Sequence, residues 1–251
     1  MLRSLVQYLV ILSLCFSGMR CNPSESASVN TTQAAESSGQ SSDVYNVAFL
    51  IMEGVYNTEL TAPYDIFQHT IFREGVKPMR VFTVANTTEP ITTFEGMRIL
   101  PDYDYLKDEF PTIDILVVPS AEHHLDTDLE DKAMLDFVRE TAEDAMFVTS
   151  HCDGAFVLAK TGILNGHVST TFPSDIDTYR KMFPQLDVRE EVLFVHDGKF
   201  ITSAGGAKSF EAALYLCEYL YGKTIAEDLA KGLVIDWNLS TVPHVVVPSG
   251  S

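Results

Sequence analysis

Short apolar runs alternate with longer amphipathic segments along most of the chain. Residues 44–52 and 113–119 are apolar at nearly every position, which is typical of central strands in a parallel sheet, because both faces of such strands are buried. Further strands are predicted at residues 79–85 and 145–149. Amphipathic periodicity predicts helices over residues 58–72, 128–144, 154–161, 173–183 and 206–221.

Turn residues separate these elements. Asp197-Gly198 between residues 192–196 and 199–202 predicts a hairpin, and residues 91–100 are expected to be extended or a second hairpin. Because strands alternate with helices, the pattern predicts an α/β, three-layer sandwich with a mostly parallel central sheet. Ligands bind at the carboxyl ends of strands in such folds, so residues that directly follow strands are the candidates for function.

The first part of the chain differs in character. Residues 1–21 contain an apolar run too short to span a bilayer, which predicts an export signal. Cys21 at its end favours a lipoprotein with a lipid anchor on that residue, although Arg20 fits poorly, and ordinary cleavage followed by secretion is the alternative. Residues 22–43 are rich in Ser, Thr, Ala and Gln and predict a flexible linker. The folded domain is expected to span residues 44–247.

Composition narrows the choice of partner. The chain has 251 residues, 46% of them hydrophobic, and a formal net charge of −18. An acidic surface repels phosphate backbones, and no basic stripe or helix-turn-helix pattern is present, so nucleic-acid binding is not expected. The expected partner is a small-molecule substrate or ligand, with the membrane involved only through the anchor.

Two cysteines fall within the predicted domain. Cys217 lies in an apolar helical stretch, which favours a buried free thiol, although an exported protein could also pair it with Cys152 in a disulfide. Cys152 stands between a strand and a helix, in Ser150-His151-Cys152-Asp153-Gly154. This spacing predicts a nucleophile elbow, in which the helix N-terminus favours the thiolate. A small buried hydrophobic residue at a strand end is the alternative.

Five motifs, taken together, resemble the ThiJ/PfpI superfamily of class I glutamine amidotransferase-like proteins, and within it the isonitrile hydratase-like branch. They cover almost the whole domain in order: ELTAPYDIF at 59–67, CDGAFVLA at 152–159, GILNG at 162–166, DGKFITSAG at 197–205 and LVIDW at 233–237. The resemblance implies a flavodoxin-like, class I glutamine amidotransferase-like fold. Dimers are common in the superfamily, so a homodimer is a possible assembly.

The resemblance also assigns roles to residues. Cys152 would be the nucleophile, and Glu59 would be a protonated acid that hydrogen-bonds the thiolate and shuttles a proton. The backbone N–H of Asp153 would donate to an oxyanion. The Asp153 side chain is expected to cap the following helix, and its charge would oppose thiolate formation. Glu59 could equally be a first-turn helix acid.

Two departures from the family pattern alter the predicted pocket. Ser120-Ala121 stands where the family has Gly-Gly, so the oxyanion hole is expected to be reshaped. Phe172 stands where many relatives have the His of a Cys-His pair, which argues against a protease or amidase mechanism. His151 is included among the pocket candidates, although neighbouring strand residues point to opposite faces.

No cofactor and no metal are expected. His123 and His124 follow a strand end and could rim the pocket, and with Glu122, Glu59 and Cys152 they could bind a metal, but their spacing matches no standard site. The leading hypothesis is therefore a cysteine-dependent small-molecule enzyme that hydrates an isonitrile. A non-catalytic ligand-binding protein of the cell envelope is one alternative, and a hydrolase or deglycase of the wider superfamily is the other.

Overall fold

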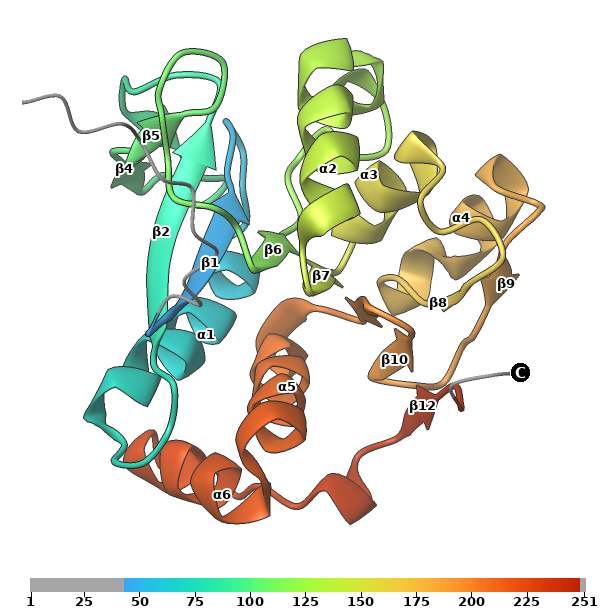
Figure 1. The fold of residues 1–251 in the computed structure, drawn as a ribbon. Helices are drawn as coiled ribbons and strands as arrows, with labels where there is room; N and C mark the ends of the chain where they lie inside the picture. The colour runs from blue at the N-terminus through green and yellow to red at the C-terminus, as the bar shows by residue number, and fades with distance from the viewer. Residues whose placement is uncertain (1–42, 249–251) are drawn as a thin grey trace, which may run out of the picture. The chain divides into compact units, whose positions relative to one another are not determined.

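The computed structural model describes residues 43–248, which contain a central sheet covered on both faces by helices (Figure 1). Eight strands form this sheet in the order β12-β10-β11-β7-β6-β1-β2-β5. Two smaller two-stranded sheets pair β3 with β4 and β8 with β9. The strands are β1 (Tyr45–Leu50), β2 (Met79–Ala85), β3 (Ile91–Thr92), β4 (Arg98–Ile99), β5 (Tyr103–Asp104), β6 (Ile115–Val118), β7 (Phe147–His151), β8 (Val168–Ser169), β9 (Asp187–Val188), β10 (Phe194–Asp197), β11 (Phe200–Ser203) and β12 (His244–Val246).

The central sheet is mostly parallel. Strands β5, β2, β1, β6, β7 and β11 all run in the same direction, whereas β10 pairs antiparallel with β11 and parallel with β12. The register places Val47 opposite both Val81 and Ile115. Because the central strands are parallel, the segments that follow β1, β6, β7 and β11 all leave the sheet at the same edge.

Helices form two layers, one on each face of the sheet. They are α1 (Asn57–Gln68), α2 (Lys132–Asp144), α3 (Gly154–Thr161), α4 (Ile176–Met182), α5 (Ser209–Tyr221) and α6 (Lys223–Gly232), with short 3-10 segments η1 (His69–Phe72), η2 (Thr127–Glu130), η3 (Pro173–Asp175), η4 (Gly206–Lys208) and η5 (Leu239–Thr241). Alternate residues of each strand face opposite layers. Val47 and Phe49 pack with α1 and α5, while Ala48 and Leu50 pack with α2 and α3.

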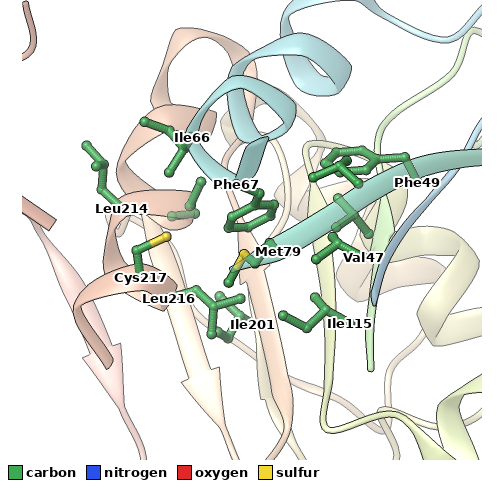
Figure 2. Close-up of a cluster of buried hydrophobic side chains, with 14 of the residues drawn as sticks. Val47, Phe49, Ile66, Phe67, Met79, Ile115, Ile201, Leu214, Leu216 and Cys217 are labelled. Atoms are coloured by element: carbon green, nitrogen blue, oxygen red, sulfur yellow. The ribbon is translucent and has the colours of Figure 1, made fainter. Parts of the chain in front are cut away.

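Figure 2 shows the core on the α1 and α5 side. Phe67 and Leu214 come from these two helices and meet strand residues such as Val47 and Ile201. Cys217 lies in this cluster as a free, fully buried thiol, as the apolar helix around it predicted. Cys152 is also free, so the alternative disulfide between the two is absent from the structure.

The α/β sandwich and its mostly parallel sheet confirm the predicted fold class, and the Asp197-Gly198 hairpin forms as predicted. Of the two alternatives for residues 91–100, extended or hairpin, the structure has the hairpin. Helix α6 and strand β12 were not predicted. The export signal at residues 1–21, with its anchor candidate Cys21, and residues 22–42 of the linker lie outside the described residues. Within residues 43–248, no helix is long and apolar enough to cross a membrane.

Candidate functional site

Cys152 occupies a tight turn between β7 and α3. Its backbone φ is 53°, a left-handed conformation that is rare for a residue with a side chain and that recurs at functional sites. The Cys152 N–H donates to the carbonyl of Ser203 at 3.0 Å, which ties the turn to the end of β11. The turn therefore has the geometry of a nucleophile elbow.

Two glycines allow the elbow to pack closely on its neighbours. A Cβ added at Gly154 would lie 2.0 Å from the carbonyl oxygen of Val118, so helix α3 can start against β6 only without a side chain there. A Cβ at Gly205, whose φ is 75°, would lie 2.3 Å from the Cβ of Cys152. The loop after β11 therefore packs directly against Cys152.

Glu59 lies in the first turn of α1 and is buried, with 6% of its surface exposed. Its Oε1 accepts the N–H of Gly206 at 2.9 Å. This contact joins α1 to the loop that covers Cys152, and the negative charge of Glu59 contributes to raising the pKa of the Cys152 thiol. The structure therefore brings the predicted acid to the predicted nucleophile.

Asp153 does not cap α3, contrary to the sequence-based expectation. Its side chain makes no capping hydrogen bond. Instead its Oδ1 accepts the hydroxyl of Thr171 at 3.0 Å, and the same hydroxyl lies 3.1 Å from the Cys152 carbonyl. Burial, together with the charge of Asp175, raises the pKa of Asp153 from 3.8 to about 6. Asp153 can therefore exchange a proton near neutral pH.

The thiol of Cys152 is held in its protonated form. Burial raises its pKa most, and the charges of Asp153 and Glu59 raise it further. The nearby Ser120 hydroxyl and Asp153 backbone act in the opposite direction but do not outweigh these effects. Burial of Cys152, which is only 7% exposed, and the flanking acids therefore oppose the thiolate that the helix N-terminus was expected to favour.

The Ser120-Ala121 turn does not offer both of its N–H groups to the site. The Ala121 N–H donates to Nδ1 of His124 at 3.2 Å, so it cannot serve as the oxyanion donor expected at this position. The Ser120 carbonyl accepts the N–H of Tyr56 at 3.0 Å. The Ser120 hydroxyl is fully buried and has no conventional hydrogen-bond partner among residues 43–248, but it acts on the Cys152 thiol and lowers its pKa.

The histidines do not supply a general base. Burial lowers the pKa of His124 to about 3. Because Nδ1 accepts a hydrogen bond from the Ala121 N–H, the ring proton of His124 lies on Nε2, 3.1 Å from Sδ of Met52. The pocket candidate His151 faces the α5 side of the sheet, where its Nδ1 lies 3.0 Å from the Ser203 hydroxyl.

Phe172 lies beside the site but is an exposed residue, with 37% of its surface accessible. It directly follows Thr171 and cannot transfer a proton, so the position supplies no Cys-His pair. The side chains that were considered as metal ligands do not form a metal site either. Within residues 43–248, no group of three His, Cys, Asp or Glu side chains is arranged to hold a metal ion.

Sequence reasoning missed two site residues. Thr171 directly precedes Phe172, which the sequence analysis singled out, but its contact with Asp153 spans 18 positions and could not be inferred. Tyr56 directly precedes α1, and its ring is tilted against the ring of the exposed Phe94 with 4.6 Å between centroids. Burial and the charge of the nearby Cys152 raise the pKa of Tyr56.

A cavity of about 500 Å³ adjoins the elbow. Thr171 connects the two, because its side chain lines the cavity while its hydroxyl contacts Asp153 and the Cys152 carbonyl. The lining residues are Thr170, Thr171, Pro173, Ile176, Glu190, Glu191, Val192 and Leu193. Cys152 is not among these residues, so Thr171 is the link between the cavity and the elbow.

A mostly parallel sheet with a strained cysteine at the end of a central strand and a buried glutamate beside it defines a class of cysteine-centred α/β domains. The model of the DJ-1/PfpI family matches residues 45–219, and the chain belongs to this family. An isonitrile hydratase of Pseudomonas putida is 29% identical over 208 residues, which cover 82% of each chain.

Two further comparisons show the range of relatives. The solved structure of a ThiJ/PfpI family protein from Pseudomonas syringae has a TM-score of 0.68 at 21% identity, covering 88% of this chain and 87% of that one. The transcriptional regulator CdhR of Pseudomonas aeruginosa is 32% identical over 103 residues, which cover 41% of this chain and 30% of the regulator. The relatives therefore include an enzyme and a regulator.

Proposed function

We propose that this protein is a cysteine-dependent small-molecule enzyme that hydrates an isonitrile to an N-substituted formamide. The observation that carries the proposal is the strained Cys152, placed between two buried acids, Glu59 and Asp153. The likeness to an isonitrile hydratase over most of the chain supports the choice of reaction. This reaction needs a nucleophile and a proton donor but no histidine base, so it is compatible with Phe172.

The reaction balances with these groups. The sulfur of Cys152 bonds to the terminal carbon of R–NC while a proton passes to that carbon through Glu59 or Asp153, giving a thioformimidate. Water then adds to the same carbon and the nitrogen takes a proton. The carbon–sulfur bond breaks, the thiol regains its proton, and R–NH–CHO leaves. The net change is the addition of one water molecule.

The raised pKa of Cys152 fits this scheme. A cysteine that attacks as a thiolate must already be deprotonated. Addition of S–H across one carbon instead uses both the sulfur electron pair and the thiol proton. The two acids retain that proton next to the reacting atom. The Asp153 backbone N–H and the Ser120 hydroxyl remain as donors to developing charge, in place of the Ala121 N–H.

Turnover of a simple alkyl isonitrile tests the proposal, with formamide measured by mass spectrometry. We expect product from the wild-type protein, none from Cys152→Ser, and a loss of at least about a hundredfold in Glu59→Gln. Glu140→Gln, an exposed change on α2, is the matched control and should retain activity. Equal product from wild type and Cys152→Ser would exclude the mechanism.

A non-catalytic ligand-binding protein is the second candidate. The occupied Ala121 N–H and the protonated thiol both favour it, because they weaken the two features that covalent catalysis uses. Binding of an isonitrile or formamide that stabilises both wild type and Cys152→Ser equally, without turnover, would support this candidate. A hydrolase or deglycase is less favoured, because Phe172 provides no base.

We further propose that the protein is exported and held at a membrane by lipid on Cys21, with secretion as a soluble protein as the alternative. The composition of residues 1–43 supports this proposal. A homodimer is also proposed, and sedimentation of the purified domain tests it.

A further inference from the structure

The cavity beside the nucleophile has two kinds of lining. Pro173, Ile176, Val192 and Leu193 supply apolar surface, and Glu191 supplies a carboxylate. Its volume of about 500 Å³ falls within the usual range for small-molecule sites. Such a lining fits an organic group with an apolar body and a polar end.

Among residues 43–248, only one of the acids around this cavity has an ion-pair partner. Glu190 pairs with Arg180 at 3.0 Å, and that arginine is the only ion-pair partner of the cavity acids among residues 43–248. Within that range, Glu191, Asp175 and Asp153 have no Lys, Arg or His within ion-pair distance. Asp175 is close enough to raise the pKa of Asp153. Asp153 therefore brings negative charge without an ion-pair partner next to Cys152, and Glu191 carries such charge at the cavity.

Acidic residues near Tyr56 add further negative charge around Cys152. Glu122 and Glu59 both contribute to the raised pKa of Tyr56. Neither acid has an ion-pair partner in the described part of the chain. The ring of Tyr56 is tilted against Phe94, which is 51% exposed. Exposed aromatic faces flanked by acids attract organic cations.

We propose that this cavity binds the non-reacting part of the substrate and that this part is a positively charged organic group, such as an ammonium, on an apolar body. The inference rests on the proposed function and specifies its substrate class. A cation in the cavity supplies the positive charge that the protein lacks there, and an anion is repelled. The same cation lowers the energy of the thiolate, so the substrate itself activates Cys152.

Methanethiosulfonate reagents that differ in charge test the inference directly at Cys152. The thiolate attacks the reagent sulfur, a disulfide forms, and methanesulfinate leaves, so no further oxidant is required. The cationic reagent carries a trimethylammonioethyl group, the anionic reagent a sulfonatoethyl group, and the neutral reagent a methyl group. Rates are measured on the wild-type protein by mass spectrometry and divided by the rates for a free small thiol.

We expect the cationic reagent to react at least about tenfold faster than the anionic reagent after this correction. The ratio should fall severalfold in Glu191→Gln and in Asp175→Asn. It should not change in Glu140→Gln, which alters net charge equally but lies in the C-terminal half of α2, towards the end of the sheet where β7 begins. Salt at about 1 M should bring the ratio close to one.

The outcomes separate the two proposals. Modification of Cys152 at equal corrected rates by all three reagents would overturn the cation inference and leave the cysteine mechanism standing. A preference that Glu191→Gln and Asp175→Asn leave intact would also overturn it, because the charge would not come from this cavity. A thiol inert to all three reagents would overturn the cysteine mechanism and the inference together.

Discussion

Replacing Asp153 with asparagine should make Cys152 more reactive. The negative charge of the Asp153 carboxylate raises the pKa of the Cys152 thiol, second only to burial. Asparagine keeps the side-chain size and an oxygen that can accept the Thr171 hydroxyl, which donates to Asp153 Oδ1 at 3.0 Å in the wild type. The substitution therefore removes charge with little change in packing.

The expected size follows from Coulomb's law. One charge at ~5 Å in a partly buried site with an effective dielectric constant of about 40 contributes roughly 1.7 kcal/mol, or about fifteenfold in thiolate population. The gain must depend on pH, because the pKa of Asp153 is about 6. Above that pH the wild-type carboxylate is charged and opposes the thiolate. Below it the carboxyl is neutral, so the substitution changes little.

Alkylation of Cys152 by iodoacetamide, followed by mass spectrometry, measures this effect. The rate for Asp153→Asn divided by the wild-type rate should be roughly ten at about pH 8 and approach one at about pH 5. Cys217 is fully buried and serves as the internal control for unfolding, and Glu140→Gln controls for net charge. A ratio of one at every pH, or slower alkylation of Asp153→Asn, would refute the view that this carboxylate restrains the nucleophile.

Asp153→Asn should also raise the free energy of unfolding at neutral pH by up to roughly 3 kcal/mol, because a folded-state pKa of about 6 instead of 3.8 destabilises the charged form. This gain should shrink as the pH falls below about 6 and vanish below about pH 3, where the carboxyl is protonated in both states, and urea titrations at neutral pH and at about pH 3 check it. Gly205→Ala should destabilise the domain by about 2 kcal/mol or more, because its Cβ would lie 2.3 Å from the Cβ of Cys152, and an unchanged urea midpoint would contradict the packing argument. Cys21→Ala should move the protein from the membrane fraction to the soluble fraction of a cell lysate. If the wild-type protein and the variant distribute equally between the two fractions, the result would count against a lipid anchor.

Local sequence signals predicted most of the fold. The uniformly apolar runs gave β1 and β6, and the Asp197-Gly198 pair gave the antiparallel β10–β11 hairpin. Gly222 was correctly placed at the end of α5, where its φ of 86° ends the helix. Helix α6 starts immediately after this glycine, and for that reason it was not predicted as a separate helix. Strand β12 has only three residues at a sheet edge, too few for a periodicity to be visible.

The site was predictable only where its chemistry is local in sequence. The elbow at Cys152 depends on a strand, a turn and a helix that follow one another. Contacts across the sheet were not predictable, such as Glu59 with Gly206, which lie 147 positions apart. The Ala121 N–H bonds His124 only three positions later, yet this contact depends on how the turn folds against its surroundings. The Ser120-Ala121 sequence predicted that the loop is reshaped, but it did not predict that His124 would accept the Ala121 N–H.

The balance between enzyme and binder depends on how the buried charges are compensated. In the protein alone, burial and two acids keep the proton on Cys152, which resembles an inert thiol in a binding protein. A substrate that carries its own positive charge reverses this balance without any movement of the protein, because it offsets Asp153 and its neighbours. Reactivity would then be confined to molecules of the right charge, and a neutral probe alone would underestimate it. Measuring Cys152 with reagents of opposite charge therefore distinguishes a lost active site from one that is activated by its substrate.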